Sequence, residues 1–167
     1  MSAIPMTGSI RTIGGITDFL EYTRFIDVLV VEDNPADARL IREAFDCFNE
    51  KCDIKLAEDG VEASDYLYKR GKYKNCKTPQ LILLDLNLPK KNGRELLIEI
   101  KKDDKLRLIP IIILTTSNDN KDVCVAYWNY ANAYIAKPTD FTEFEELIKI
   151  FEDFWFKMAI LPKCGLD

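Results

Sequence analysis

Short apolar runs alternate along the chain with longer stretches in which apolar residues recur at helical spacing. The apolar runs are typical of strands buried on both faces, and the longer stretches are typical of amphipathic helices. The expected strands are 28–31, 53–57, 81–84, 110–114 and 133–136, and the expected helices are 35–48, 60–69, 94–102, 121–129 and 140 to about 155. This alternation predicts an α/β fold, in which a five-stranded parallel sheet carries helices on both faces and right-handed crossovers.

One domain accounts for most of the 167 residues, because a chain of this length fits a single hydrophobic core. We expect an N-terminal extension at 1–25, one folded domain at 26–157 and a C-terminal tail at 158–167. Residues 17–21 could begin a short helix, and a mobile tail is the alternative. Because the C-terminal tail is too short for a DNA-binding or enzymatic domain, we expect the folded domain to act through its own surface.

Composition and charge exclude several classes of function. The chain has no histidine, which rules out Ser-His-Asp and Cys-His catalysis and histidine-ligated metals. Its five cysteines form no C-x-x-C pair, so neither a zinc site nor a disulfide framework is expected. The net charge of −5 argues against a broad nucleic-acid surface. No apolar run approaches the roughly 20 residues that span a bilayer, so we expect a cytoplasmic protein without membrane contact or direct nucleic-acid binding.

Polar side chains follow the predicted strands at one edge of the sheet. Glu32 and Asp33 follow the first strand, Asp85 the third, Thr115 the fourth and Lys137 the fifth. Because the carboxyl ends of parallel strands lie on one rim, we expect these side chains to converge. Three carboxylates in one pocket need a compensating cation, and hard oxygen ligands favour Mg²⁺. The carboxylate of Asp85 could act as a nucleophile toward phosphorus, with Lys137 and the metal offsetting charge and Thr115 hydrogen-bonding a phosphoryl oxygen.

Four motifs occupy these strand ends. They are Glu32-Asp33-Asn34, Leu83-Leu84-Asp85-Leu86-Asn87-Leu88-Pro89 with Asn92-Gly93, Leu114-Thr115-Thr116-Ser117 and Tyr134-Ile135-Ala136-Lys137-Pro138. The set resembles the receiver domain of two-component response regulators, over about residues 27–157. The resemblance implies a flavodoxin-like receiver fold with strand order 2-1-3-4-5. It also implies that Asp85 accepts a phosphoryl group from a histidine of a partner sensor kinase, with Mg²⁺ required.

The same resemblance assigns the metal ligands. Asp33 and Asp85 would bind Mg²⁺ directly. Asn87 would bind it through its backbone carbonyl, and Glu32 would bind it through a water molecule.

The resemblance also assigns the groups that respond to the phosphoryl group. Lys137 would contact it, and the peptide bond between Lys137 and Pro138 is expected to be cis. Thr115 and Tyr134 would form the switch pair. In that pair Thr115 moves toward the phosphoryl group and Tyr134 turns inward behind it.

A narrower resemblance rests on three stretches and on the long polar connector before residue 78. The stretches are 78–95, Leu114-Thr115-Thr116-Ser117 and the ending Phe154-Trp155 followed by Leu161-Pro162-Lys163. They are similar to the small single-domain regulators that partner cyanobacterial phytochromes. This similarity implies a phytochrome kinase as the partner and light as the input.

One corner departs from the family pattern. The family usually has Gly-Ala before the fifth strand, and Tyr130 stands at the position of that glycine. The glycine supplies a left-handed stop for the preceding helix. Asn129 could take the left-handed conformation in its place.

Aromatic side chains gather in the C-terminal part of the chain, around the fourth helix and fifth strand and at the end of the last helix. They are Tyr127, Trp128, Tyr130, Tyr134, Phe151, Phe154, Trp155 and Phe156. Many can fill the core, Phe151 above all, but two amphipathic elements cannot turn all of them inward, so we expect an outer apolar patch. We expect this face, with Tyr127, Trp128, Tyr134, Phe154 and Trp155 at the interface, to form a symmetric homodimer when Asp85 is phosphorylated.

Two other functions fit parts of the pattern. A hydrolase of the haloacid-dehalogenase type also uses an aspartate nucleophile, Mg²⁺, Thr and Lys. That class needs a second Asp where this chain has Asn87, and its acidic pair follows the nucleophile in sequence. A degenerate receiver acting as a phosphorylation-independent binding module usually lacks one of the key residues, and all are present here. We therefore expect a phosphoacceptor signalling domain, not an enzyme, that supports its own phosphoryl transfer and autodephosphorylation.

Overall fold

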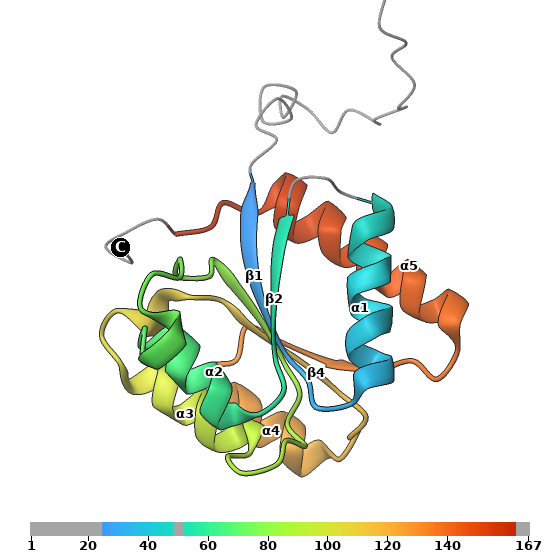
Figure 1. The fold of residues 1–167 in the computed structure, drawn as a ribbon. Helices are drawn as coiled ribbons and strands as arrows, with labels where there is room; N and C mark the ends of the chain where they lie inside the picture. The colour runs from blue at the N-terminus through green and yellow to red at the C-terminus, as the bar shows by residue number, and fades with distance from the viewer. Residues whose placement is uncertain (1–24, 49–51, 163–167) are drawn as a thin grey trace, which may run out of the picture.

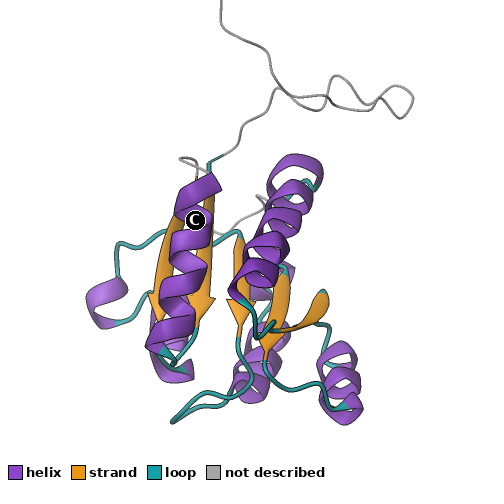
Figure 2. Ribbon diagram, turned by 90° about the vertical axis from the view of Figure 1, so that its right-hand side faces the viewer, coloured by secondary structure: helices purple, strands orange, loops and turns teal. Residues whose placement is uncertain are grey.

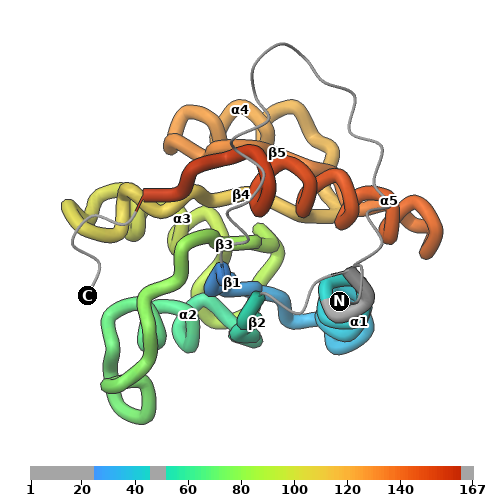
Figure 3. The backbone as a smooth tube through the Cα atoms, turned by 90° about the horizontal axis from the view of Figure 1, so that it is seen from above, coloured from blue at the N-terminus to red at the C-terminus, as the bar shows by residue number. Residues whose placement is uncertain are grey.

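Five parallel strands form a sheet in the order β2-β1-β3-β4-β5. The strands are β1 Ile26–Val31, β2 Cys52–Ala57, β3 Leu81–Leu84, β4 Ile111–Thr115 and β5 Ala133–Ala136. The computed structural model describes residues 25–48 and 52–162, so the helix expected at 17–21 lies outside the described residues. Figure 3 views the sheet from above, and its strand labels follow one another in this order. The predicted fold class and strand order are confirmed.

Helices cover both faces of the sheet (Figure 1, Figure 2). On one face lie α1 Pro35–Phe48 and α5 Phe141–Glu152, and on the other lie α2 Gly60–Leu67, α3 Gly93–Lys102 and α4 Asn120–Trp128. The shorter turns are the 3-10 helices η2 Gly71–Tyr73 and η3 Leu106–Leu108 and the π-helix η4 Asp153–Met158, which continues α5. Within residues 25–48 and 52–162, no helix combines the length and the apolarity needed to cross a bilayer.

The central strand β3 is anchored from both sides of the sheet. Its side chains alternate between the two core layers, as the pleat of a strand requires. Ile82 and Leu84 pack under α2, α3 and α4, and Leu81 and Leu83 pack under α1 and α5. Each of these side chains is almost completely buried, and burial of one such residue contributes roughly 1.5–3 kcal/mol. The residue that follows β3, Asp85, therefore starts from a firmly held backbone.

At the corner before β5, α4 ends in a left-handed residue as the family pattern requires, but that residue is Tyr130 and not Asn129. Tyr130 has φ 64°, whereas Asn129 has φ −97°, so the expectation that Asn129 takes the left-handed conformation is wrong. The backbone N–H groups of Ala131 and Tyr130 donate to the carbonyls of Ala126 and Tyr127, each at 3.0 Å, which is the bond pair of a Schellman stop. These bonds offset the left-handed strain, which costs an L-residue about 1–2 kcal/mol.

The expected cis bond before Pro138 is also wrong, because no peptide bond among the described residues is cis. The trans form is intrinsically favoured before proline by about 0.5–1 kcal/mol. Lys137 needs no cis bond to reach its partners, since its backbone N–H donates to the Thr115 carbonyl at 2.8 Å. That ladder bond directs the lysine side chain toward the rim of the sheet.

Candidate functional site

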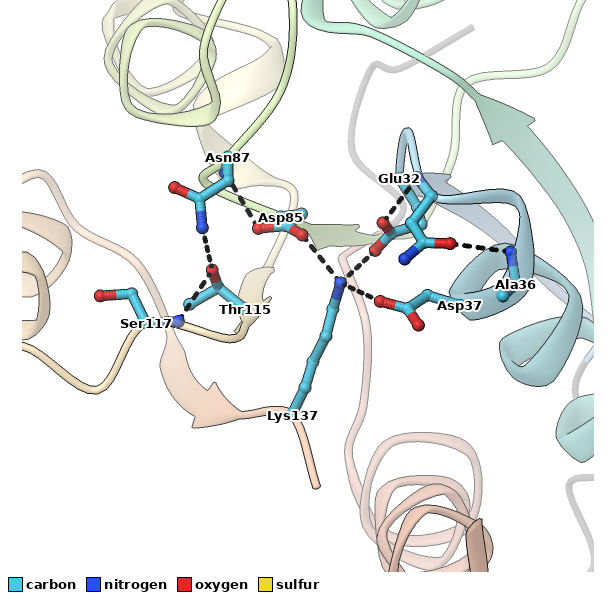
Figure 4. Close-up of polar contacts among 9 residues, drawn as sticks. Glu32, Ala36, Asp37, Asp85, Asn87, Thr115, Ser117 and Lys137 are labelled. Carbon is cyan, nitrogen blue, oxygen red and sulfur yellow. Dashed lines mark hydrogen bonds and ion pairs between the residues drawn. The ribbon is translucent and has the colours of Figure 1, made fainter. Parts of the chain in front are cut away.

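The carboxyl ends of four strands bring polar side chains to one rim of the sheet. Glu32 follows β1, Asp85 follows β3, Thr115 ends β4 and Lys137 follows β5. In Figure 4 the Lys137 side chain extends from the end of β5 toward carboxylates that belong to other elements. The structure thus brings these four sequence-predicted residues together, because the carboxyl ends of parallel strands lie at the same edge of the sheet.

The Lys137 ammonium group lies among three carboxylates. Its Nζ is 2.5 Å from Glu32 Oε2, 2.8 Å from Asp85 Oδ2 and 2.9 Å from Asp37 Oδ2. An ammonium group has three N–H donors, so each carboxylate takes one. Sequence reasoning missed Asp37. Its place in the first turn of α1, shortly after the Glu32-Asp33 pair, is the signal that could have found it.

Burial strengthens these ion pairs, and it makes the pKa of each group depend on its charged partners. The Lys137 side chain is 4% exposed, and those of Glu32 and Asp85 are 2% and 6% exposed. Burial raises the pKa of Glu32, against the opposing effect of its bonds from Lys137 and from the Asn34 backbone N–H. Burial also acts to lower the pKa of Lys137, but hydrogen bonds to Asp85, Glu32 and Asp37 outweigh it and raise the pKa above its ordinary value. The lysine therefore stays charged and compensates the buried carboxylates.

A divalent cation fits the acidic side of this pocket. Carboxylate oxygens of Glu32, Asp33 and Asp85 all lie within 4.8 Å of one another, and Asp33 is exposed while the other two are buried. Hard oxygen donors at this spacing suit Mg²⁺, which keeps several waters when it binds to a few carboxylates. The donor set therefore fits a divalent cation, and Mg²⁺ itself stays a prediction.

A groove of about 270 Å³ opens beside the acidic pocket. Its walls come from the loop after β1, the first turns of α1 and the end of β2. They comprise Glu32, Asp33, Pro35, Ala38, Arg39, Arg42, Leu56 and Glu58. The exposed Arg39 and Arg42 thus border the acids on the solvent side, where an anionic group could approach.

The loop after β3 orients the Asp85 carboxylate. The backbone N–H of Asn87 donates to Asp85 Oδ1 at 3.0 Å, while Lys137 occupies Oδ2. The Asn87 side-chain amide donates to Thr115 Oγ1 at 3.4 Å, and the Ser117 backbone N–H approaches the same oxygen at 3.5 Å. Thr115 is fully buried, so its hydroxyl has a fixed position beside the loop. Both carboxylate oxygens of Asp85 are therefore held in place.

Tyr134 connects β5 to the loop after β4. Its hydroxyl donates to the Ser117 carbonyl at 3.0 Å, and burial raises the pKa of that hydroxyl. The Ser117 hydroxyl donates to Asp122 Oδ2 at 2.7 Å, and Arg94 Nη2 lies 2.6 Å from Asp122 Oδ1. Sequence reasoning identified Tyr134 but missed Ser117, Arg94 and Asp122 as its supports, because the contact joins α3, α4 and a loop that are far apart in sequence.

The aromatic residues divide between core and surface. Phe151 and Phe156 are buried, and their ring centroids lie 5.8 Å from that of Phe45 on α1. The exposed members are Tyr127, Trp128, Tyr130 and Phe154, and the half-buried members are Tyr134 and Trp155. Trp128 is the most open of them, at 86% exposure. Exposed aromatic rings therefore occur on α4, just after it and in η4, while the patch expected from the sequence stays a prediction.

Residues 28–149 match the family model described as the response regulator receiver domain. The chain is 39% identical over 135 residues to response regulator Rcp1 of Synechocystis sp., a match that covers 81% of this chain and 92% of Rcp1. It is 38% identical over 140 residues to a protein of Methanothrix harundinacea named "Probable methanogenesis regulatory protein FilR2", covering 83% of this chain and 88% of that protein.

Solved structures of two such proteins are similar to this fold. The phosphorylated cyanobacterial phytochrome response regulator RcpA superposes with a TM-score of 0.79 at 43% identity, covering 82% of this chain and 98% of RcpA. The Mn²⁺-bound form of Rcp1 also gives a TM-score of 0.79, at 39% identity, covering 82% of this chain and 99% of that chain. Both agree in architecture with the sheet and helix layers described above.

Proposed function

The chain belongs to the response regulator receiver domain family, and on this premise we propose that Asp85 accepts a phosphoryl group from a sensor histidine kinase. One observation carries the proposal. Asp85 directly follows the central strand β3, and its carboxylate accepts a hydrogen bond from the buried Lys137 ammonium and lies close to the carboxylates of Glu32 and Asp33. Membership of this family of signalling domains argues against a dehalogenase-type hydrolase. We propose that the receiver domain comprises residues 26–157 and that the flanking segments lie outside it. We also propose a cytoplasmic location.

In the proposed reaction, an oxygen lone pair of Asp85 attacks the phosphorus of a phosphohistidine on the kinase. A P–O bond forms as the P–N bond breaks, and the histidine nitrogen keeps the bonding electron pair and takes up a proton. Lys137 would donate an N–H to a phosphoryl oxygen, and Thr115 would donate its hydroxyl to another. The bonds from Asn87 and Lys137 orient the carboxylate before the reaction, which reduces the entropic part of the barrier.

Four residues would hold Mg²⁺ in this proposal. Asp33 and Asp85 would bind it directly, Asn87 through its backbone carbonyl and Glu32 through a water molecule. When bound, the cation would offset the negative charge of the transferring phosphoryl group. The spacing of the carboxylate oxygens supports this assignment, as does the Mn²⁺ bound by the related Rcp1.

The proposed switch consists of Thr115 and Tyr134. Once the phosphoryl group is present, Thr115 would turn its hydroxyl toward it and leave space behind β4. Tyr134 would exchange its bond to the Ser117 carbonyl for an inward position. This change would reshape the loop after β4 and the face of α4 and β5, and so report phosphorylation at the surface.

That face is the proposed homodimer interface. β5 is an edge strand, flanked by α4 and α5 (Figure 3). Tyr127 and Trp128 of α4 and Phe154 of η4 are exposed, and Tyr134 of β5 and Trp155 of η4 are half-buried. Burial of these rings against a second copy of the chain, related by a two-fold axis, would remove the apolar patch from water. Phosphorylation of Asp85 would favour this dimer through the switch pair.

We propose a phytochrome histidine kinase as the partner, supported by the similarity to RcpA, a cyanobacterial phytochrome response regulator. The test is transfer of radiolabelled phosphate from autophosphorylated kinases, a cyanobacterial phytochrome and an unrelated sensor kinase, to the wild type and to Asp85→Asn. The wild type should be labelled fastest by the phytochrome, and Asp85→Asn should remain unlabelled. Faster transfer from the unrelated kinase would refute the phytochrome partnership. No transfer to the wild type would favour a phosphorylation-independent binding module.

A further inference from the structure

Asp37 is a carboxylate of the pocket that the proposed chemistry has not used. It lies in the first turn of α1, and its Oδ2 is 2.9 Å from Lys137 Nζ. Figure 4 shows it on the side of the lysine away from Asp85 and Thr115. The Asp37 side chain is 26% exposed, in contrast to the buried Glu32 and Asp85 that share the same ammonium group.

We propose that Asp37 is a positioning residue for phosphoryl transfer, which holds the Lys137 ammonium until an incoming phosphoryl group takes its place. This inference rests on the proposed function of Asp85. In the structure all three N–H groups of Lys137 are donated to carboxylates. A phosphoryl oxygen can receive an N–H from Lys137 only if one of these carboxylates releases its own.

Burial decides which carboxylate is released. Glu32 is almost completely buried, so leaving it without the lysine would cost the full desolvation of a charged group. Asp85 receives the phosphoryl group, so Lys137 must stay next to Asp85 in order to contact that group. Asp37 is partly open to solvent, and water can replace the lost hydrogen bond. Asp37 is therefore the partner that gives up Lys137.

The charge of Asp37 has two opposite consequences. It adds a third negative charge around the ammonium group that Glu32 and Asp85 share, so it strengthens the attraction of the pocket for a divalent cation. It also repels the negatively charged phosphodonor and competes with it for Lys137. Removal of this charge should therefore weaken Mg²⁺ binding and at the same time accelerate phosphorylation when Mg²⁺ is saturating. A residue with a purely structural role would change both quantities in the same direction or neither.

The test compares the wild type with Asp37→Asn, which keeps the shape and an accepting oxygen but removes the charge. Calorimetric titration of the unphosphorylated protein gives the Kd for Mg²⁺, and the rate of intact-mass gain with acetyl phosphate gives phosphorylation at saturating Mg²⁺. We expect Asp37→Asn to raise the Kd about fivefold and to increase the rate about fivefold, since a single nearby charge acts partly through solvent. Asp37→Glu should return both quantities toward the wild type.

Glu43→Gln is the matched control, because it removes one negative charge from the same helix, where Glu43 pairs with the exposed Arg39. It should leave both quantities near wild-type values. The inference is overturned if Asp37→Asn matches the wild type, if its two quantities worsen together, or if Glu43→Gln has an equal effect. A wild type that gains no phosphoryl group would overturn the proposed function and this inference with it. A phosphorylated wild type with an unaltered Asp37→Asn would overturn the inference alone.

Discussion

Gly93 begins α3 directly behind the loop that carries Asp85, and its lack of a side chain lets the two backbones approach closely. A Cβ at this position would lie 2.1 Å from the Asp85 carbonyl oxygen, 2.7 Å from Leu86 Cα and 2.9 Å from the Asp85 carbonyl carbon. The Gly93 N–H also donates to the Leu86 carbonyl at 3.0 Å. The substitution Gly93→Ala must therefore push the Asp85 loop away from α3.

The cost of Gly93→Ala follows from the kind of atoms that its methyl group would meet. Ordinary contacts of a Cβ begin at 3.4 Å, so the backbones must separate by more than about 1 Å. All three atoms belong to the backbone, and none can move aside by a change of rotamer. Overpacking typically costs about 1–3 kcal/mol, and we expect Gly93→Ala to lie at the upper end, near 3 kcal/mol of unfolding free energy.

Gly71→Ala is the matched comparison. Gly71 has φ 52° and open space around its Cβ position, so alanine there meets backbone strain without a steric clash. We expect a loss of about 1 kcal/mol. Urea unfolding followed by circular dichroism measures both variants, and the initial rate of phosphorylation is measured on the folded proteins.

Gly93→Ala should also slow phosphorylation, because the displaced loop carries Asp85, whereas Gly71→Ala should react at the wild-type rate. A Gly93→Ala protein as stable as Gly71→Ala would refute the steric reasoning. Wild-type phosphorylation in a clearly destabilised Gly93→Ala would refute the link between this contact and the position of Asp85.

Three further predictions concern charge, pH and assembly. Lys137→Met leaves buried carboxylates uncompensated, so without metal it should lower the unfolding free energy by about 3–5 kcal/mol. In urea titrations, Mg²⁺ should restore more stability to the variant than to the wild type. An equal stabilisation of both proteins by Mg²⁺ would contradict this prediction. Hydrogen bonds from Tyr73 above all, from the Glu58 backbone N–H and from Lys72 lower the pKa of Glu62 from 4.5 to about 2. Glu62 therefore stabilises the fold above pH 4.5 and loses this effect as the pH falls toward 2. Glu62→Gln should therefore be less stable than the wild type at pH 7, with a difference that shrinks below pH 4.5; a constant difference would be evidence against the bond. Trp128→Ser should weaken the phosphorylated dimer at least about tenfold by light scattering, and a wild type that stays monomeric in both states would remove the dimer proposal.

The sequence was sufficient to predict the layered fold because the inner strands β1, β3 and β4 are buried on both faces, and the helices pack on them along one side. The edge strands β2 and β5 are only partly buried. The residues of β3 and β4 are all buried, so their apolar runs carry an unambiguous signal. Element ends are less determined: β1 begins at Ile26 although Val28 was expected, and α2 ends at Leu67 although the pattern continued to residue 69. Caps and turns decide such boundaries, and their energies are small compared with core burial.

The parts of the site that the sequence did not predict depend on contacts between distant segments. Asp37 reaches Lys137 across 100 residues, and Arg94 reaches Asp122 across 28. For Asp37 the only local signal is its place in the first turn of α1, shortly after the acidic pair. Nothing in the local pattern distinguishes Arg94 or Asp122 from solvated charges on a helix surface. The left-handed Tyr130 was missed for a related reason, because the Schellman bonds of that corner override the poor intrinsic preference of a tyrosine.

The most direct test of the central claim is the intact mass of the protein after incubation with Mg²⁺ and a small phosphodonor. We expect the mass of one added phosphoryl group on the wild type, and no addition with Asp85→Asn or in the presence of EDTA. A folded, Mg²⁺-binding wild type that gains no mass, or an Asp85→Asn variant that gains as much as the wild type, would contradict the assignment of Asp85 as the phosphoacceptor.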